Sequence, residues 1–260
     1  MTPGDPVAEL AGRMKSGPRI TVLTGAGVSA ASGVPTFRGP LGLWRNYAPE
    51  QLATPEAFRR DPKLVWEWYN WRRELIAKCV PNVAHTVLAA WSRRYPDFTL
   101  ITQNVDGLHE KAGTINVVRF HGSIWEVLCW RRCPSSPERW WDESVPLPNI
   151  PPSCPYCHGL LRPGVVWFGE SIGSSVLDRS YEAVKCDLFL TVGTSAVVHP
   201  AASLVAEASS LGAFTVEINP EATPSSGAVD LAIQGRAEVV LPSVESLLKN
   251  QEFEIRDSRS

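Results

Sequence analysis

A short apolar strand that runs directly into a glycine-rich turn restricts the fold of this chain more than any other feature. The strand is predicted over residues 19–24 (RITVLT), a β-branched run that stops at Gly25, as a buried parallel strand does. Residues 25–30 then read GAGVSA, a match to G-x-G-x-x-A. In such a turn Gly25 permits the bend, Gly27 lets the backbone approach a pyrophosphate, and Ala30 lets the next helix pack close to the sheet. This context predicts dinucleotide binding, and the alternative is a glycine turn that serves only packing.

Strand and helix signals alternate along most of the remaining chain. Further strands are predicted over residues 98–102, 117–120, 165–168, 188–192 and 214–218. Helices are predicted over residues 7–14, 61–79, 83–95, 175–186, 200–211 and 243–250. Alternating strands and helices predict an α/β fold with a Rossmann-type, doubly wound, mostly parallel sheet.

The segment after the glycine turn argues against hydride transfer. A dehydrogenase would continue into a second strand that ends in an acidic residue about 20 residues further on. Here residues 34–39 (VPTFRG) lead into a stretch, residues 33–55, that carries loop signals without a period. We therefore expect a bound nucleotide beside a long functional loop.

Composition excludes several other classes of function. Apolar residues make up 44% of the 260 positions, enough for one large α/β domain with a smaller appendage. The formal net charge of −2 gives no general attraction to nucleic acid or to anionic membranes. No stretch resembles a signal peptide or a membrane span, so we expect a cytoplasmic protein. We also expect a monomer.

Four cysteines in two close pairs indicate a metal site. Cys129 and Cys133 form the first pair, and Cys154 and Cys157 form the second, within a proline-rich stretch that has little periodicity. Reduced thiols in this arrangement predict a tetrahedral structural Zn²⁺, whereas two disulfides or inert thiols are the alternatives. Four thiolates leave no open coordination position, so we do not expect this zinc to be catalytic.

Seven motifs occur in one order along residues 19–241 and together carry a family resemblance. They are GAGVSAASGVPTFRG at 25–39, TQNVDGLH at 102–109, FHGS at 120–123, the paired cysteines, VVWFGE at 165–170, GTS at 193–195 and INPE at 218–221. The chain resembles the sirtuin family of NAD-dependent protein-lysine deacylases. The resemblance implies a smaller zinc-ribbon and helical domain beside the Rossmann-type domain, with a cleft between them. The expected parts are a large domain over 1–36, 98–126 and 165–255, a cofactor loop and helical module over 37–97, a zinc ribbon over 127–164, and a tail over 256–260.

The resemblance also assigns residues to NAD, the co-substrate that is consumed. A neutral imidazole is a natural general base, and although an isolated histidine after a strand is more often structural, the family context makes His121 the catalytic base. Asn104 and Asp106 would anchor the ribose and the nicotinamide amide, with Asn104 also counted as catalytic; a simple Asn-Val-Asp-Gly turn is the alternative. The other residues expected at NAD are Gly25, Ala26, Gly27, Ser29, Phe37, Arg38, Trp44, Gln103, Val105, Gly193, Thr194, Ser195, Asn219, Pro220, Glu221 and Ala237.

The helix predicted over residues 61–79 carries the acyl-group hypothesis. Tyr69 and Arg72 are i, i+3 neighbours, and an arginine with a tyrosine hydroxyl suits the carboxylate of a succinyl-, malonyl- or glutaryl-lysine. Arg73 is i, i+4 from Tyr69, so spacing alone does not choose between the arginines; the resemblance favours Arg72 and adds Ala53 as a small residue that widens the pocket. An amphipathic helix with an exposed arginine is the alternative. A peptide substrate would add as a strand to the extended segment Val166, Trp167, Phe168, Gly169 and Glu170.

Three rival functions remain at this point. A protein mono-ADP-ribosyltransferase and a general deacetylase without acidic-acyl preference both fit the resemblance. A zinc-ribbon module that binds nucleic acid or protein is disfavoured by the net charge.

Overall fold

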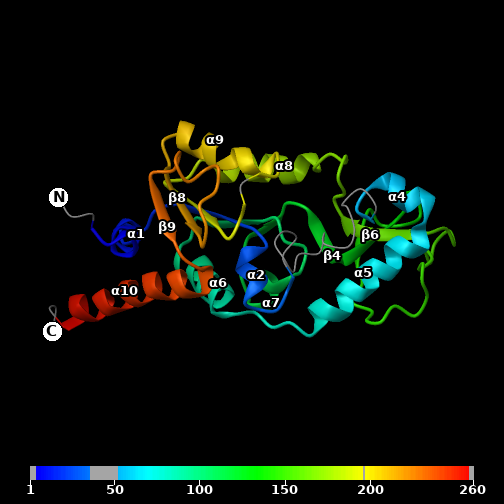
Figure 1. Ribbon diagram of the computed structural model, residues 1–260, viewed down its shortest axis with the longest axis horizontal. Coiled ribbons are helices and arrows are strands. Elements are labelled where there is room, and N and C mark those ends of the chain that lie inside the picture. The colour runs from blue at the N-terminus through cyan, green and yellow to red at the C-terminus, as the bar shows by residue number, and fades with distance from the viewer. Residues whose placement is uncertain (1–3, 36–51, 196, 258–260) are drawn as a thin grey trace.

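The computed structural model describes residues 4–35, 52–195 and 197–257, and it has two parts (Figure 1). One part is built on a parallel sheet and the other on a small antiparallel sheet with two helices. Of the residues expected at NAD, Phe37, Arg38 and Trp44 lie outside the described residues.

The larger sheet confirms the predicted fold class. Its order is β3-β2-β1-β7-β8-β9, and every neighbouring pair is parallel. The order reverses between β1 and β7, and in such sheets ligands bind in the crevice at the carboxyl ends of the strands beside this reversal. The strands are β1 (Ile20–Thr24), β2 (Phe98–Thr102), β3 (Val117–Arg119), β7 (Leu188–Val192), β8 (Phe214–Asn219) and β9 (Leu231–Gln234). Sequence patterns did not predict β9, a short strand at the sheet edge.

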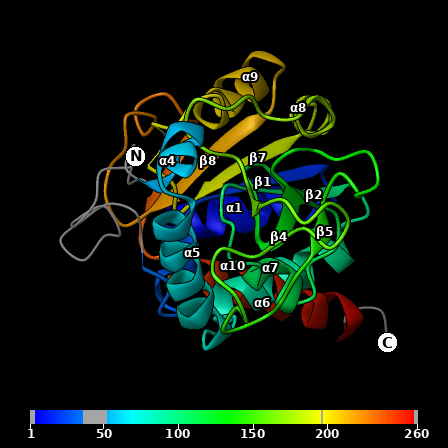
Figure 2. The same cartoon turned by 90° about the vertical axis from the view of Figure 1, so that its right-hand side faces the viewer.

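Helices cover both faces of this sheet (Figure 2). The helices α1 (Pro6–Met14), α6 (Val83–Arg94) and α10 (Ala237–Asp257) contribute to one apolar core, and α8 (Ser174–Ala183) and α9 (Leu204–Ser210) to the other. No helix in the described ranges is both long and apolar enough to cross a membrane.

Two predicted boundaries in this part are wrong. We grouped α6 with the module over 37–97, yet its Trp91 indole N–H donates to Glu245 of α10 and its apolar face packs in the core of the large sheet. The last helix begins at Ala237 instead of residue 243 and continues into the expected tail over 256–260. The predicted start followed Pro242, but a proline removes only one backbone donor, and the burial of Leu241 and Val244 offsets that loss.

The smaller part holds an antiparallel sheet of order β5-β4-β6. Its strands are β4 (Gly122–Cys129), β5 (Trp140–Trp141) and β6 (Leu161–Val165), and α4 (Pro55–Arg60) and α5 (Pro62–Ala77) share an apolar core with them. The predicted parallel strand over 165–168 is therefore wrong, because the strand ends at Val165 and pairs with β4. The expected boundary at residue 126 also falls inside β4.

The two sheets meet where the chain leaves β3 and enters β4. Gly122 has a φ of +75°, and a Cβ there would overlap the carbonyl oxygen of Gly164 on the facing strand. Only glycine tolerates both conditions at this close approach of two backbones. His121 precedes this glycine, so the fold places its imidazole at the junction between the sheets.

Candidate active site

The glycine turn after β1 packs against the turn after β7. The Gly27 N–H donates to the Gly193 carbonyl at 2.8 Å, and a Cβ on Gly25 or Gly27 would lie 2.8 Å from that same oxygen. Gly193 has a φ of +59°, and a Cβ on it would lie 2.6 Å from the Val28 nitrogen. The packing of the two turns against each other therefore requires glycine at these positions, whether or not a ligand binds there. Their approach to a pyrophosphate stays a prediction.

The helix that follows this turn differs from the expected one. The helix α2 (Gly27–Ala30) is a single turn, and Ala30 is exposed. The prediction that Ala30 lets a helix pack against the sheet is wrong, because the fully buried Val28 lies in that core instead. A helix of four residues also sums few peptide dipoles at its N-terminus.

A buried polar cluster joins the turn after β1 to the end of β2. The Asn104 amide donates to the Gly25 carbonyl at 3.0 Å and to the Ser29 hydroxyl at 3.2 Å. The Ser29 hydroxyl donates in turn to the Asp106 carboxylate at 2.8 Å. Burial raises the pKa of Asp106, while the N–H of Leu108 at 2.9 Å and the Ser29 hydroxyl oppose that rise. One hydrogen-bonded network therefore links Ser29, Asn104 and Asp106, as the expected NAD site requires.

His85 completes this cluster, and sequence reasoning missed it. Its Nδ1 accepts the backbone N–H of Asn82 at 3.3 Å in a helix capping box, so Nε2 carries the hydrogen of the neutral ring. Nε2 lies 3.3 Å from the Ser29 hydroxyl, which already donates to Asp106 and therefore accepts from His85. Burial lowers the pKa of His85 to about 4, so the ring is neutral near pH 7. The available signal was the cap pattern Asn82-x-x-His85 at the start of α6.

The geometry of His121 suits a base. Its Nδ1 lies 3.1 Å from the Gln103 carbonyl oxygen, which only accepts, so we assign the ring hydrogen to Nδ1 and the lone pair to Nε2. Burial lowers the pKa of His121 below the ordinary 6.5, which keeps the ring neutral near pH 7. The Gln103 side chain continues across the sheet and donates to the Thr194 hydroxyl at 2.9 Å. Val105 follows the carboxyl end of β2, and its side chain is buried in the core of the smaller part.

Other residues expected at NAD lie at the ends of β7 and β8. Ser195 and Glu221 are exposed, and the Asn219 amide donates to the Glu221 carbonyl at 2.7 Å across Pro220. Ala237 differs from the prediction of a ligand contact, because its side chain is buried in the apolar core. Glu217, which sequence reasoning missed, is buried on β8 and accepts hydrogen bonds from Thr223 and Ser226. It fastens the loop that carries Asn219 and Glu221.

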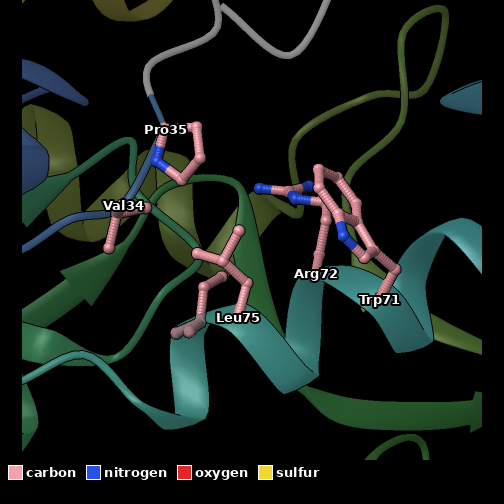
Figure 3. Close-up of a pocket in the computed structure, with 6 residues that line it drawn as sticks. Val34, Pro35, Trp71, Arg72 and Leu75 are labelled. Carbon is pink, nitrogen blue, oxygen red and sulfur yellow. The ribbon is translucent and has the colours of Figure 1, made fainter.

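The structure separates the two arginines of α5. Arg73 is fully buried and donates to the Ile124 carbonyl at 2.8 Å and to Asp142 at 3.4 Å, so it ties α5 to the small sheet. Arg72 lines a small cavity together with Val34, Pro35, Trp71, Leu75 and Ile76. Figure 3 shows its guanidinium extending from α5 into that cavity, between Trp71 and Pro35. Arg72 is 6% exposed, and burial lowers its pKa, which the nearby Tyr69 and Asp106 oppose.

Residues 166–170 form a turn instead of an open strand edge. The N–H groups of Val166 and Phe168 donate to the carbonyls of His121 at 2.9 Å and Ala53 at 3.0 Å. The Trp167 N–H donates to Glu170 at 2.9 Å, and the Glu170 N–H donates to the Trp167 carbonyl at 3.0 Å. The prediction of a strand with free N–H groups here is therefore wrong. The turn nevertheless links the His121 backbone to Ala53, as a shared site requires.

The four predicted metal ligands come together. The sulfur atoms of Cys129, Cys133, Cys154 and Cys157 all lie within 4.8 Å of one another, with 3.6 Å between Cys129 and Cys157 and 3.9 Å between Cys133 and Cys154. Zn–S bonds of about 2.3 Å at tetrahedral angles separate sulfurs by about 3.8 Å, so the cluster fits one zinc ion, whereas a disulfide needs about 2.05 Å. Cys79 and Cys186, which are not part of this cluster, are both buried.

Known proteins share this sequence and arrangement. The sequence profile of the Sir2 family matches residues 25–200. A relative from Aquifex aeolicus (strain VF5), named an NAD-dependent protein deacylase, is 51% identical over 233 residues, which are 89% of this chain and 96% of that relative. A solved Sir2 homologue in complex with NAD aligns with a TM-score of 0.84 at 45% identity and covers 94% of both chains. A Sir2 protein with a deacetylated p53 peptide and 3′-O-acetyl ADP-ribose aligns at 0.83 and 28% identity, over 92% of this chain and 97% of that one. This chain therefore belongs to the Sir2 family, the sirtuins.

Proposed function

We propose that this sirtuin is an NAD-dependent protein-lysine deacylase that prefers succinyl-, malonyl- or glutaryl-lysine over acetyl-lysine. In the proposed reaction the acyl group moves from lysine to ADP-ribose and nicotinamide is released. Membership of the Sir2 family and relatives named NAD-dependent protein deacylases support the general activity. The position of Arg72 in the cavity beside α5 is the observation that carries the acyl preference.

His121 would supply the base. Its Nε2 holds the lone pair of a neutral ring, because Nδ1 is occupied by the Gln103 carbonyl and burial lowers the pKa. A proton can therefore pass from a ribose hydroxyl to Nε2 without prior deprotonation of the ring. The backbone of His121 also accepts from Val166, so the base and the substrate-facing turn keep a fixed relation.

The buried cluster of Ser29, Asn104 and Asp106 would hold the nicotinamide ribose. Asp106 is the acceptor of that cluster, and Asn104 ties it to the glycine turn. The glycines at positions 25, 27 and 193 let the two turns pack against each other, beside the point where a pyrophosphate would lie. These residues fit the recognition of NAD by hydroxyl and backbone donors.

The acidic acyl group would meet Arg72 and Tyr69. Arg72 is a nearly buried cation, and water competes little for hydrogen bonds to its guanidinium. A dicarboxylic acyl chain would bring a carboxylate to this cation and form hydrogen bonds that an acetyl group lacks. The rings of Trp68 and Tyr69 lie 4.8 and 5.8 Å from the Arg72 guanidinium carbon and keep the guanidinium in place.

We propose that an acyl-lysine peptide lies along residues 166–170 and that one structural zinc binds the four cysteines. Since four N–H groups of this turn are already bonded within the chain, the peptide would donate to its backbone carbonyls. Zinc would cross-link the proline-rich stretch and hold β4 and β6, on which this turn depends.

A panel of acyl-lysine peptides, each incubated with and without NAD and read by mass spectrometry, tests the proposal. The expected result is NAD-dependent loss of succinyl, malonyl or glutaryl groups, release of nicotinamide and formation of acylated ADP-ribose. Attachment of ADP-ribose to the peptide would make the protein a mono-ADP-ribosyltransferase. Equal rates for acetyl and succinyl peptides would reject the acyl preference and leave a general deacetylase.

A further inference from the structure

The Tyr69 hydroxyl has a defined orientation. The Trp167 indole N–H lies 3.0 Å from the Tyr69 oxygen, and an indole nitrogen only donates, so the hydroxyl accepts this bond. The hydrogen of the Tyr69 hydroxyl must then point elsewhere, and the described residues offer it no acceptor in hydrogen-bond distance. Tyr69 is 2% exposed, and a buried donor without an acceptor destabilises the folded protein. This hydroxyl is therefore prepared to donate to a ligand.

The Trp167 ring is held on several sides. The Arg162 guanidinium carbon lies 3.6 Å from the centre of the indole ring, and Phe58 packs 5.3 Å away, centroid to centroid. Arg162 is itself buried and forms an ion pair with Glu170 at 2.5 Å, while Glu170 accepts the Trp167 backbone N–H. The pKa of Glu170 is lowered despite the opposing effect of burial, because Arg162 and the Trp167 N–H stabilise the carboxylate. Trp167 is 2% exposed, so solvent does not compete for its indole N–H.

We infer that Trp167 is a specificity-determining positioning residue that acts through Tyr69. By occupying the acceptor side of the phenol oxygen, the indole directs the hydroxyl hydrogen away from itself. The Arg72 guanidinium carbon lies 5.8 Å from the centre of the Tyr69 ring, so a carboxylate bound at Arg72 can accept that hydrogen. This inference rests on the proposed function, because it concerns the same acyl site.

An acetyl group provides the internal comparison. It lacks a distal carboxylate, so the orientation of the Tyr69 hydroxyl should not affect its removal. The turn that carries Trp167 also bonds to the His121 carbonyl through Val166, so a general disturbance of the turn would slow both reactions. The ratio of the two activities therefore separates the specific role from a structural one.

The test compares Trp167→Phe, Tyr69→Phe and the double variant by kcat/KM on succinyl- and acetyl-lysine peptides. Each single variant should lower the succinyl-to-acetyl ratio of kcat/KM about tenfold, about 1.4 kcal/mol. The double variant should also lower this ratio about tenfold instead of 100-fold, because both changes remove one shared interaction. Trp167→His, whose ring N–H can still donate, should regain part of the preference.

Trp66→Phe is the matched control. Trp66 is fully buried on the same helix, and its indole N–H donates to the Leu161 carbonyl at 2.7 Å, away from Tyr69. It should lower the melting temperature and leave the succinyl-to-acetyl ratio unchanged.

Three results would overturn the inference: an unchanged ratio in Trp167→Phe, equal losses on both peptides, or additive losses in the double variant. A wild-type protein with no succinyl preference would reject the proposed function itself. A wild-type preference that survives Trp167→Phe would reject only the role of Trp167. If Trp167→Phe does not fold, Trp167→His decides, because full loss of preference in that variant contradicts the role of the N–H.

Discussion

Replacing Arg72 by methionine should remove the acidic-acyl preference and little else. The change keeps an unbranched apolar stem of similar length against Trp68 and Leu75 but deletes the guanidinium that enters the cavity of Figure 3. The substitution leaves Arg73 intact, and Arg73 donates to the Ile124 carbonyl of the small sheet, so α5 should keep its attachment. The variant should therefore fold and bind NAD.

The size of the effect follows from the burial of Arg72. A hydrogen bond to a charged group contributes about 1.5–3 kcal/mol, and solvent cannot compete where the side chain is 6% exposed. Loss of a charge-assisted pair of such bonds in that setting gives about 2.7 kcal/mol, or a 100-fold fall in kcat/KM for desuccinylation. Acetyl removal should change less than about threefold. A small change is expected there because Arg72 lowers the pKa of Asp106, a minor influence beside that of burial.

The assay measures kcat/KM for paired succinyl and acetyl peptides of one sequence, with nicotinamide release as the common readout. Arg94→Met is the matched control. Arg94 of α6 forms an ion pair with Glu245 of α10 at 2.8 Å, in the part of the protein built on the large sheet, so this substitution should affect stability alone. Equal losses on both peptides in Arg72→Met, or a retained succinyl preference, would refute the carboxylate role of Arg72.

The remaining predictions concern the base, the metal and the glycine turns. Activity should fall as the pH drops through the pKa of His121, because the base must be neutral. Burial lowers that pKa, so the midpoint in the pH profile of kcat/KM should lie below 6.5. A midpoint above 6.5 would contradict this assignment. Cys129→Ser should lose about one zinc per chain by metal analysis and melt at lower temperature, whereas Cys186→Ser should retain the metal. Gly193→Ala should lower the free energy of unfolding by more than the roughly 1–2 kcal/mol that a left-handed alanine costs, because its Cβ would also meet Val28. Gly17, with a φ of +69°, has open space around it, so Gly17→Ala should show the conformational cost alone. Chemical denaturation measures both.

Much of the site was predictable because its signals are local. The turn after β1 needs glycines within a few residues of one strand, and the four thiols fall in two close pairs, so adjacent positions carry most of the information. His121, the proposed base, follows shortly after one strand, and Asn104 and Asp106 follow another. Parallel strands bring such positions to one edge of a sheet, which makes their meeting predictable from order alone.

The strand β6 shows why other parts were not predictable. Its residues include Arg162 and Pro163, which no strand pattern favours, and the buried arginine is accommodated only because Glu170 folds back to pair with it. The same ion pair turns residues 166–170 away from the extended edge that VVWFGE suggested. Partners eight residues apart across a turn are invisible to a period-two pattern.

The amino-acid sequence alone determined the family, the parallel sheet and the thiolate cluster, because each follows from short local motifs and from the order in which they occur along the chain. Only the tertiary structure showed the different surroundings of Arg72 and Arg73, which are adjacent on one helix and both within one turn of Tyr69. Contacts with Ile124 and Asp142, distant in sequence, hold Arg73 against the small sheet and leave Arg72 to the cavity. Spacing along a helix defines which face a side chain occupies, but what that side chain meets depends on how the other elements pack around it.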